Sequence, residues 1–568
     1  MNYKFIYRDP QQQFISIELR VKSIGKELEL ILPAWRPGRY ELGDFAKNIK
    51  SFKVFSENGK PLKFEKTSKN KWVISTPESE VILVSYQYYA AEINAGSSYI
   101  DESQLYVNPV NCCFYSLEYY DSEIKLELEI PSDWKIASPI LTQKNQLIAS
   151  NFDELADSPF ICSPFLQYNS YQVDEYNFHL WFNGLVKPDW ERLKIDFEQF
   201  TRLQIEKFIE FPTKNYHFMF QILPYNAYHG VEHSGCTVIT LGPSYAVFEK
   251  LYNELLGVSS HELYHTWNVK SIRPVDLFPY DFSKENFSKL GYIAEGVTTY
   301  MGDLMLFRSG VFTLRQYLFE LSKQIQRHLD NFGRFNYSVA ESSYDTWLDG
   351  YSAGVPGRKV SIYTEGCIIA FALDVLIMKE TKNKKRLDDV MRCLYHNYAK
   401  KGKGITEANY KYEIQNITGN PVDSFFEKFI NGTNAFEGLI NETLDYLGLK
   451  LQTQPHHEYN CSNLGFKTST NGSKLNVSSI YPGSPYDVAG GRIGDIILSL
   501  NDVRIENNLN EWLNYFSEDS KSLCIERNGS LKILSIPEVS RTFYQTYWIV
   551  ENEQVTKSQK DAFQKWMN

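Results

Sequence analysis

The sequence has few of the features that mark secreted, membrane-spanning or disulfide-rich proteins. Its 568 residues include only eight cysteines, with no C-x-x-C pair and no regular spacing, so no disulfide framework is indicated. The longest apolar stretch, residues 367–378, is interrupted by Asp374 and is too short for a membrane span of about 20 residues. Lys4 and Arg8 interrupt the N-terminus, which therefore lacks the core of a signal peptide. These absences predict a reduced, cytoplasmic protein with no membrane partner.

Positive charge is also scarce relative to negative charge. The chain has 59 Lys and Arg against 69 Asp and Glu, a formal net charge of −10, which argues against a nucleic-acid partner. Hydrophobic residues make up 43% and charged residues 23%, a globular balance. Aromatic residues are abundant at 15%, and rings pack well on the pleated surface of a sheet. The composition therefore predicts several globular domains, some of them rich in β-structure.

Residues 1–170 show the period-two alternation of β-strands. The segments 14–21, 28–32, 81–88 and 124–130 alternate apolar with polar residues, and Asn-Gly and Pro-Gly turn signals separate strands. No long helical pattern intervenes. We therefore predict an N-terminal antiparallel β-sandwich.

Residues 171–447 change from mixed to helical patterning. Strand-like segments occur at 178–182, 217–223 and 236–241, and helical periodicity follows at 312–329, 362–379, 387–398 and 421–431. This order predicts a multidomain α+β protein whose second domain combines a sheet with a helical bundle. Residues 448–540 return to short strands and Gly-rich turns, as expected of one small domain, and residues 541–568 are predicted to form a helical tail.

The clearest chemical motif is the pentapeptide His261 to His265, HELYH. On a helix the two histidines lie one turn apart on the same face, where both imidazoles can hold one Zn²⁺. Glu262 between them is placed to take a proton from a water at the open coordination position. The alternative is an amphipathic helix that happens to carry two histidines, because Leu256, Leu263 and Trp267 form an apolar stripe. That stripe is compatible with a metal site on the opposite face.

A catalytic zinc site needs a third protein ligand, for which Glu295 is the best candidate. It lies 30 residues beyond His265 on a second expected helix, among the apolar residues Ile293, Ala294 and Val297. A lone helical glutamate is usually a solvated surface residue. In this apolar setting a buried carboxylate would be costly without a partner, and metal ligation would supply one.

Several blocks together resemble the glycyl aminopeptidases, metallopeptidase family sixty-one. The blocks are residues 33–40 (PAWRPGRY), residues 153–159 (DELADSP), the zinc helix with Glu295, residues 361–366 (SIYTEG) and the C-terminal segment. The order of the blocks is more specific than the zinc motif, which many peptidases share. The resemblance implies a thermolysin-like zinc peptidase domain of the gluzincin type, one Zn²⁺ per chain, and a peptide substrate with a free N-terminus.

The resemblance also implies roles for the segment at residues 229–233, HGVEH. This segment matches a Gly-Gly-x-Glu-His-like strand whose glutamate holds the substrate's α-amine in related aminopeptidases, so Glu232 is the expected amine ligand. Gly230 and His233 are expected at the substrate too, although His233 could equally order the strand. His229 departs from the usual glycine. The alternative for Glu232 is a surface residue of an edge strand.

Two further assignments rest on the resemblance. Tyr363 matches the tyrosine that donates to the developing oxyanion in the relatives, and without the resemblance it would be taken for a packed aromatic at a helix start. The C-terminal segment resembles a PDZ domain, with Leu464, Gly465 and Phe466 where a peptide C-terminus would bind. The alternative is a PDZ fold that only packs against the rest of the chain.

The sequence thus predicts a zinc aminopeptidase, and the resemblance implies a preference for small first residues such as Gly or Ala. Two alternatives stay open. One is an endopeptidase with the same zinc chemistry and no amine anchor. The other is a peptide-binding scaffold that uses the PDZ segment and retains a non-catalytic metal. Co²⁺ and Mn²⁺ also occupy such sites. The physiological substrate, the PDZ ligand and the oligomeric state are not indicated by the sequence.

Overall fold

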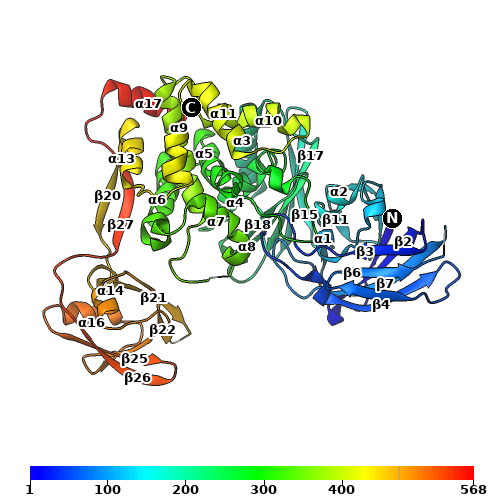
Figure 1. The fold of residues 1–568 in the computed structure, drawn as a ribbon, viewed down its shortest axis with the longest axis horizontal. Helices are drawn as coiled ribbons and strands as arrows, with labels where there is room; N and C mark the ends of the chain where they lie inside the picture. The colour runs from blue at the N-terminus through cyan, green and yellow to red at the C-terminus, as the bar shows by residue number, and fades with distance from the viewer. Residues whose placement is uncertain (78, 353, 473) are drawn as a thin grey trace. The chain divides into compact units, whose positions relative to one another are not determined.

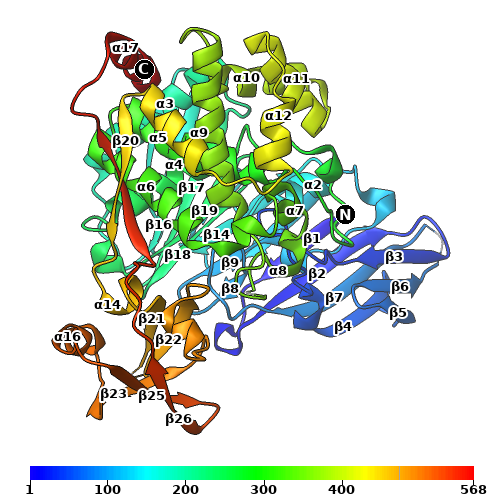
Figure 2. The same cartoon turned by 60° about the vertical axis from the view of Figure 1, so that its left-hand side comes forward.

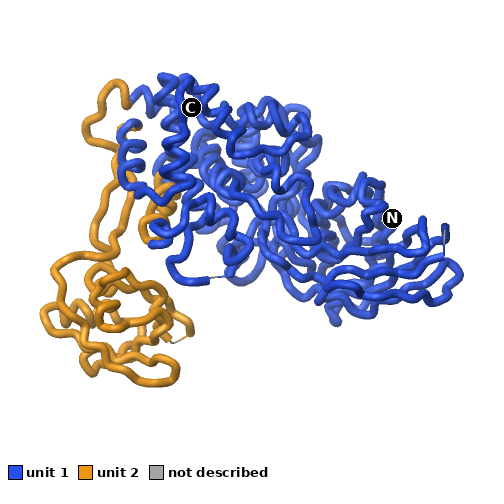
Figure 3. The backbone as a smooth tube through the Cα atoms, in the orientation of Figure 1, with its two compact units in different colours: residues 1–317, 332–446, 560–568 blue, residues 318–331, 447–559 orange. Residues whose placement is uncertain are grey.

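The computed structural model describes residues 1–77, 79–352, 354–472 and 474–568. The chain divides into two compact units, shown in different colours in Figure 3. The first unit comprises residues 1–317, 332–446 and 560–568, and the second comprises residues 318–331 and 447–559. Every residue predicted to hold metal or the substrate's N-terminus lies in the first unit. The segment predicted to be a PDZ domain lies in the second unit.

The N-terminal part of the first unit is built from three sheets (Figure 1). The largest has the strand order β12 (Leu141–Gln143), β13 (Gln146–Ala149), β10 (Ile124–Glu129), β1 (Asn2–Ile6), β2 (Phe14–Lys22), β7 (Val81–Tyr89) and β4 (Ile49–Ser56). The second is β3 (Glu27–Ile31), β6 (Lys71–Ser75) and β5 (Phe64–Ser68), and the third is β11 (Lys135–Ala137), β14 (Phe160–Ser163), β9 (Leu105–Val107) and β8 (Tyr99–Ile100). Two short helices, α1 (Pro109–Cys112) and α2 (Phe152–Ala156), connect strands.

The prediction of a purely antiparallel sandwich is wrong at one position. Strand β1 pairs with β2 in antiparallel fashion but with β10 in parallel, so the largest sheet is mixed. A parallel neighbour needs a long crossover, and more than a hundred residues separate β1 from β10. Alternation along the chain predicts strands, but it contains no information about a partner so distant in sequence.

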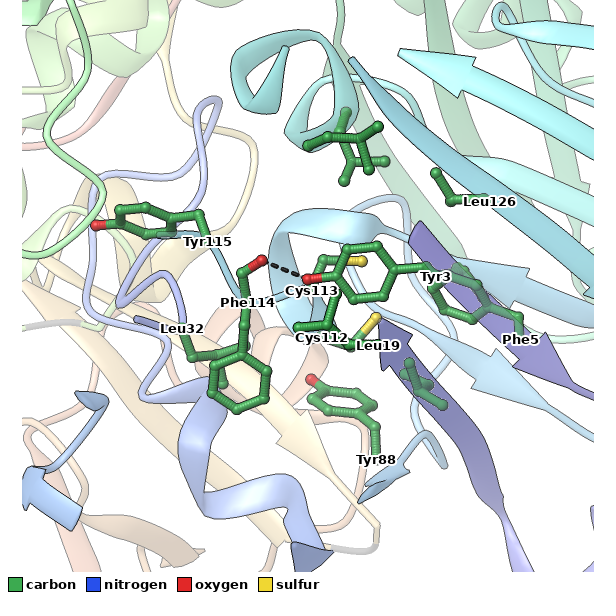
Figure 4. Packing of buried hydrophobic residues seen from close by; sticks show 14 of the residues in the cluster. Tyr3, Phe5, Leu19, Leu32, Tyr88, Cys112, Cys113, Phe114, Tyr115 and Leu126 are labelled. Atoms are coloured by element: carbon green, nitrogen blue, oxygen red, sulfur yellow. Dashed lines mark hydrogen bonds between the residues drawn. The ribbon is translucent and has the colours of Figure 1, made fainter. Parts of the chain in front are cut away.

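The alternating strands bury one face each in a shared hydrophobic core. Along β2, every second residue from Ile15 to Val21 is buried, as the period-two pattern predicts. Figure 4 shows the centre of this core, where the hydroxyl of Tyr3 donates a hydrogen bond to the carbonyl oxygen of Phe114. The buried Tyr86 hydroxyl likewise donates to the Cys112 carbonyl oxygen at 2.7 Å. Each fully buried large apolar side chain stabilises the fold by about 1.5–3 kcal/mol.

The second part of the first unit contains a five-stranded sheet. Its order is β15 (Gln167–Val173), β16 (Tyr176–Gly184), β17 (Asn215–Ile222), β19 (Cys236–Gly242) and β18 (Ala227–Glu232). The three central strands are mutually parallel, and β17 and β19 are buried along almost their whole length, while β15 and β18 run antiparallel at the two edges. The edge strand β18 ends at Glu232, which places the predicted amine ligand at a sheet edge.

Helices pack against this sheet and form the remainder of the first unit. In Figure 2 helices α4 (Tyr252–Tyr264), α5 (Thr298–Arg308) and α9 (Ile362–Glu380) lie together near the middle of the unit. The others are α3 (Trp190–Phe208), the start of α6 (Leu314–Asp330), α7 (Val339–Tyr344), α8 (Thr346–Asp349), α10 (Leu387–Asn397), α11 (Glu407–Thr418), α12 (Asp423–Phe425), α13 (Glu437–Tyr446) and the end of α17 (Lys557–Met567). The four helices predicted from periodicity are confirmed, although the last divides into α12 and a π-helical turn, Phe426–Ile430.

The second unit contains a twisted antiparallel sheet with short helices. Its strands are β21 (Phe466–Asn471), β22 (Lys474–Ile480), β23 (Ile496–Leu500), β25 (Lys521–Arg527) and β26 (Ser530–Ile536), and β24 (Val503–Arg504) pairs with β23. Its helices are α14 (Tyr459–Ser462), α15 (Pro485–Val488) and α16 (Leu509–Tyr515). A separate ribbon pairs β20 (Leu449–Pro455) with β27 (Gln545–Glu551).

The predicted helical tail is correct only for its last part. Residues 545–551 form β27 because they pair with β20, and only α17 is helical. Within the first unit, Trp566 of α17 is buried, and its indole N–H donates to the hydroxyl of Tyr300 at 3.0 Å. In the part of the chain that the structure describes, none of the helices combines the length and the apolar character that a membrane crossing needs.

Candidate metal and peptide site

Helix α4 carries the predicted metal motif near its C-terminal end. Its back face is apolar and buried, with Leu255 and Leu263 inside the unit. Helix α5 packs closely against its other side, because a Cβ on Gly302 would lie only 3.0 Å from the Cα of His261. Only a glycine permits this approach, which fixes the backbone that carries the histidine.

The three predicted metal ligands lie together. The Nε2 atoms of His261 and His265 are 3.0 Å apart, and the Oε2 atom of Glu295 lies 3.8 Å from the first and 3.3 Å from the second. Ligands arranged tetrahedrally about 2.0–2.1 Å from a zinc ion are about 3.3–3.4 Å apart. The observed separations therefore fit one tetrahedral ion, of which the three donors would hold three of the four positions.

A hydrogen bond orients His265 for ligation. Its Nδ1–H donates to the carbonyl oxygen of Asn268 at 2.7 Å, which leaves Nε2 free to face the other ligands. The Asn268 side-chain amide donates in turn to the carbonyl oxygen of Ile293 at 2.8 Å and to Thr298 Oγ1 at 3.0 Å. Asn268 thus connects the end of α4 to the segment that bears Glu295. The sequence analysis missed Asn268, and its only signal is its position three residues after His265.

Glu295 lies in a π-helical turn, Tyr292–Val297, that leads into α5. Its side chain is only 2% exposed, as its apolar neighbours predict. The next residue, Gly296, meets the backbone of α9, because a Cβ there would lie 2.2 Å from the Cα of Gly366. Local widening of a helix to a π-turn is common at functional sites, and here it accompanies the close contact between two backbones.

The charges of these buried groups indicate a site made for a cation. Burial alone would raise the pKa of Glu295, but the imidazoles of His265 and His261 hold it at about 2. Burial opposes a charged His265, yet Glu295 raises the pKa of that imidazole to about 10. Without a metal ion, a proton on His265 therefore balances the carboxylate. A divalent cation would satisfy all three donors at once.

Two further carboxylates face the same point. Glu232, Glu262 and His265 each offer an atom within 4.8 Å of the others. Burial raises the pKa of Glu262 well above its usual range, against the attraction of His265. Glu232 Oε1 and Glu262 Oε2 are buried and have no hydrogen-bond partner in the described residues. Buried carboxylate oxygens are normally bonded, so these two are available to a ligand.

Two glycines allow the carboxylates to take these positions. A Cβ on Gly230 would lie 2.2 Å from Glu262 Oε1, and a Cβ on Gly38 would lie 2.5 Å from Glu232 Oε2. Gly230 was predicted as a substrate contact, and the structure places it against Glu262 on the edge strand. Gly38 belongs to the N-terminal block PAWRPGRY, whose role the sequence did not indicate.

Gly38→Ala is expected to impair substrate binding by displacing Glu232. Gly38 has a φ of +78°, so alanine costs about 1–2 kcal/mol of backbone strain, and its methyl group also meets the carboxylate. We expect KM for free-amine substrates to rise about tenfold, equivalent to about 1.4 kcal/mol. The matched control is Gly59→Ala, because Gly59 has a φ of +75° and no atom within 4 Å of its Cβ position. Equal KM values in the two variants would contradict the contact with Glu232.

His233 is held by an ion network rather than facing the metal ligands. Its Nδ1 lies 3.0 Å from Asp157 Oδ1, and Lys270 Nζ lies 2.7 Å from the same oxygen. Burial opposes ionisation of Asp157, but Lys270 and His233 hold its pKa well below the usual range. The backbone N–H of Ser234 also donates to Asp157 at 2.9 Å. Through Asp157 the network connects the block DELADSP, residues 153–159, to the end of the strand that carries Glu232.

Tyr363 lies in the first turn of α9, where Ser361 caps the helix by accepting from Thr364 N–H. Burial and then the nearby Glu295 raise the pKa of Tyr363 well above its usual range, so its hydroxyl stays protonated. Tyr351 forms a side-chain hydrogen bond with Tyr363 and accepts from the backbone N–H of Tyr40 at 3.4 Å. The sequence analysis missed Tyr351, and nothing local distinguishes it from the other tyrosines.

The three residues predicted to bind a peptide C-terminus lie in the second unit. Leu464 and Phe466 are buried, and Gly465 has a φ of +72° just before β21. The carbonyl oxygen of Leu464 accepts from Tyr486 N–H, and that of Gly465 accepts from Tyr481 N–H at 2.8 Å. Backbone hydrogen bonds therefore hold the loop that leads into β21, the edge strand of this sheet.

Comparison with protein families gives two matches. Residues 2–164 match the Peptidase M61 N-terminal domain, and residues 254–369 match the M61 glycyl aminopeptidase domain. The second match includes the three predicted metal ligands, Glu262 and Tyr363. A search of curated protein sequences gives no match.

The solved structure of an aminopeptidase N family protein is similar to the chain in fold. An aminopeptidase N family protein from Idiomarina loihiensis has a TM-score of 0.92 and 24% identity, and the match covers 100% of both chains. An M1 zinc metallopeptidase from Deinococcus radiodurans has a TM-score of 0.49 and 12% identity over 76% of this chain and 94% of its own. A mutant of that metallopeptidase has been solved with a Tyr-Ser-Ala substrate, with a TM-score of 0.48 and 13% identity over 76% of this chain and 94% of its own. By these matches the chain is an enzyme, a peptidase of the aminopeptidase class, in which residues 2–164 and 254–369 are similar to the two M61 domains.

Proposed function

We propose that the chain is a zinc-dependent aminopeptidase that removes small N-terminal residues, Gly or Ala, from peptides. The observation that carries the proposal is the set of five side chains at one point. Three of them, His261, His265 and Glu295, fit a tetrahedral metal ion, and two partnerless carboxylates lie beside them. The preference for Gly or Ala rests on the resemblance to the glycyl aminopeptidases alone.

The residues of the chain have separate tasks in this proposal. Zn²⁺ held by the two histidines and Glu295 supplies Lewis-acid chemistry, which polarises a carbonyl group and makes water more acidic. Glu262 accepts the proton of the attacking water and returns it to the nitrogen of the leaving amine. Its raised pKa favours holding that proton between the two steps. Tyr363 donates a hydrogen bond to the oxygen that becomes negative in the tetrahedral intermediate.

Glu232 distinguishes an aminopeptidase from an endopeptidase. A carboxylate beside the metal ligands accepts charge-assisted hydrogen bonds from an α-ammonium group, which places the first peptide bond in register with Glu262. Its unbonded, buried Oε1 supports this role. An endopeptidase would bind uncharged backbone at this point, where a buried carboxylate without a cation is unfavourable.

The test is cleavage of an N-terminal residue library in free and acetylated forms. We expect free Gly and Ala peptides to be cleaved at least about tenfold faster than their acetylated forms, because a charge-assisted hydrogen bond contributes about 1.5–3 kcal/mol. Glu232→Gln keeps the shape but removes the charge, and it should abolish that preference. Equal cleavage of free and acetylated peptides by the unmodified protein would support the endopeptidase instead.

Metal analysis of the same sample completes the test. We expect about one zinc per chain and loss of that zinc in His265→Ala. The control is Cys461→Ala, because His456, Glu458 and Cys461 form a second cluster close enough to hold a metal. A peptide-binding scaffold with a remnant metal would retain zinc but cleave no member of the library, which would refute the proposed activity.

For the second unit we propose a PDZ fold. The support is an antiparallel sheet whose edge strand β21 follows the loop of Leu464, Gly465 and Phe466. PDZ domains bind an extended peptide by adding a strand at such an edge. Whether this sheet takes a peptide C-terminus or serves only as packing is decided by titrating the protein with peptides that have free or amidated C-termini.

A further inference from the structure

A second charged group near the candidate site has no partner of opposite sign. Arg36 is only 6% exposed, and the structure gives its guanidinium one hydrogen bond, from NH1 to the carbonyl oxygen of Pro37 at 3.3 Å. Across the described residues it forms no ion pair with a carboxylate. Almost all buried arginines are paired, because an unpaired charge in the interior is strongly destabilising.

Among the charged neighbours of Arg36, Arg39 increases this cost, while Glu232 relieves part of it without forming an ion pair. Burial lowers the pKa of the Arg36 guanidinium, and the positive charge of Arg39 lowers it further. Arg39 is itself paired with Glu41. His229 also faces the two arginines, and burial together with their charge lowers its pKa to about 3, so its imidazole is neutral. None of these groups forms an ion pair with Arg36, so an anion from outside the chain would be its first direct partner.

The guanidinium is held in place rather than free to move. A Cβ on Gly96 would lie 1.9 Å from the Arg36 Cζ atom, so the group rests directly against that glycine's backbone. It lines a cavity of about 550 Å³ whose wall also includes Ser97, Ser98 and Asn111. The N–H groups of a guanidinium lie in one plane, and two of them can donate parallel hydrogen bonds to the two oxygens of a carboxylate.

One tight turn connects this cation with the proposed amine anchor. Arg36 and Arg39 close the turn, in which Arg39 N–H donates to the Arg36 carbonyl oxygen at 3.3 Å. Gly38 within the turn is the residue that meets Glu232. Glu232 is among the groups whose charge acts on Arg36, and Tyr351, whose pKa burial raises so that its hydroxyl stays protonated, forms a side-chain hydrogen bond with Tyr363. The partnerless cation therefore lies close to the partnerless carboxylate.

We propose that Arg36 binds a carboxylate of the substrate, so that the enzyme selects peptides with an anionic group close to the free α-amine. This inference rests on the proposed aminopeptidase function and adds the substrate class. The carboxylate has two possible sources. In a dipeptide it is the C-terminus, which is compatible with a small first residue. In a longer peptide it is the side chain of an acidic first residue.

Two matched substrate pairs test the proposal on the unmodified enzyme. Ala-Ala is compared with Ala-Ala amide, and Glu-Ala amide is compared with Gln-Ala amide, by kcat/KM at pH 7. We expect the member with the carboxylate to be cleaved at least about tenfold faster in one pair, and that pair identifies the source of the carboxylate. If both ratios are within twofold of one while the neutral peptides are cleaved, this inference is wrong and the aminopeptidase function stands. If no peptide is cleaved, both fail.

A variant then assigns the preference to Arg36. In the pair that shows the preference, Arg36→Gln should bring the ratio of kcat/KM values, carboxylate substrate over neutral substrate, to near one. It should leave kcat/KM for the neutral amide within about threefold of the value for the unmodified enzyme. The control is Arg8→Gln, which removes an exposed cation of the same N-terminal part and should keep the ratio unchanged. Retention of the full ratio in Arg36→Gln would overturn the assignment. Because each readout is a ratio within one protein sample, a partly misfolded variant cannot imitate the result.

Discussion

Glu262→Gln is expected to lower kcat by about 10²–10⁴-fold, the usual contribution of a positioned general base. Glutamine has the shape of glutamate but cannot accept a proton from water at neutral pH. KM should change little, because the proposed anchor for the substrate is Glu232. The metal content should also stay at the level of the unmodified protein, since Glu262 is proposed as the base and lies beside the three proposed ligands.

The environment of Glu262 explains why so large an effect is expected. The side chain is buried next to His265, its Oε2 has no partner among the described residues, and Gly230 leaves room for its other oxygen. A carboxylate in such a place is fixed by its surroundings and needs no reorganisation before it accepts a proton. Burial also raises its pKa, which brings it closer to that of a base that both takes and returns a proton.

The control for this variant is Glu254→Gln on the same helix. Glu254 lies about two turns earlier in α4 and is half-buried, so its substitution tests the loss of a helix carboxylate without touching the site. We expect kcat within about twofold of the unmodified enzyme. Comparable losses in both variants, or loss of metal from Glu262→Gln, would contradict the role of Glu262 as the base.

The structure brings together the three side chains that the sequence predicted as metal ligands. The helical spacing of His261 and His265 is enough to place two imidazoles on one face, and apolar neighbours mark Glu295 as buried. The π-helical turn around Glu295 was not predicted, because its sequence is typical of an ordinary helix. The turn accompanies a close contact between Gly296 and Gly366, which lie in separate helical segments.

The groups that sequence reasoning missed are all positioned by distant parts of the chain. Gly38 and Arg36 lie in a turn of the N-terminal part, yet they meet residues of the peptidase sheet that are far away in sequence. The parallel pairing of β1 with β10 has the same origin. Periodicity and motifs describe one segment at a time, so they predict elements and local clusters but not which elements meet.

Tyr363→Phe is expected to lower kcat by about 10²–10³-fold, the usual cost of removing one donor to an oxyanion. Phenylalanine keeps the ring that packs at the start of α9 and removes only the hydroxyl. Because that hydrogen bond strengthens as the carbonyl oxygen becomes negative, kcat and kcat/KM should fall together while KM changes little. Zinc content and thermal stability should stay close to those of the unmodified protein.

Tyr351→Phe is the matched control, since it removes a hydroxyl that bonds to Tyr363 rather than the proposed donor itself. Tyr351 accepts from the backbone of Tyr40, and the ring of Tyr351 packs under the Arg39 guanidinium at 4.8 Å from its centroid. Its loss should loosen the position of Tyr363 and lower kcat less than tenfold. If Tyr351→Phe proves the more damaging variant, the two assignments are reversed. The donor would then come from the segment between α8 and α9, and Tyr363 would be the positioning residue.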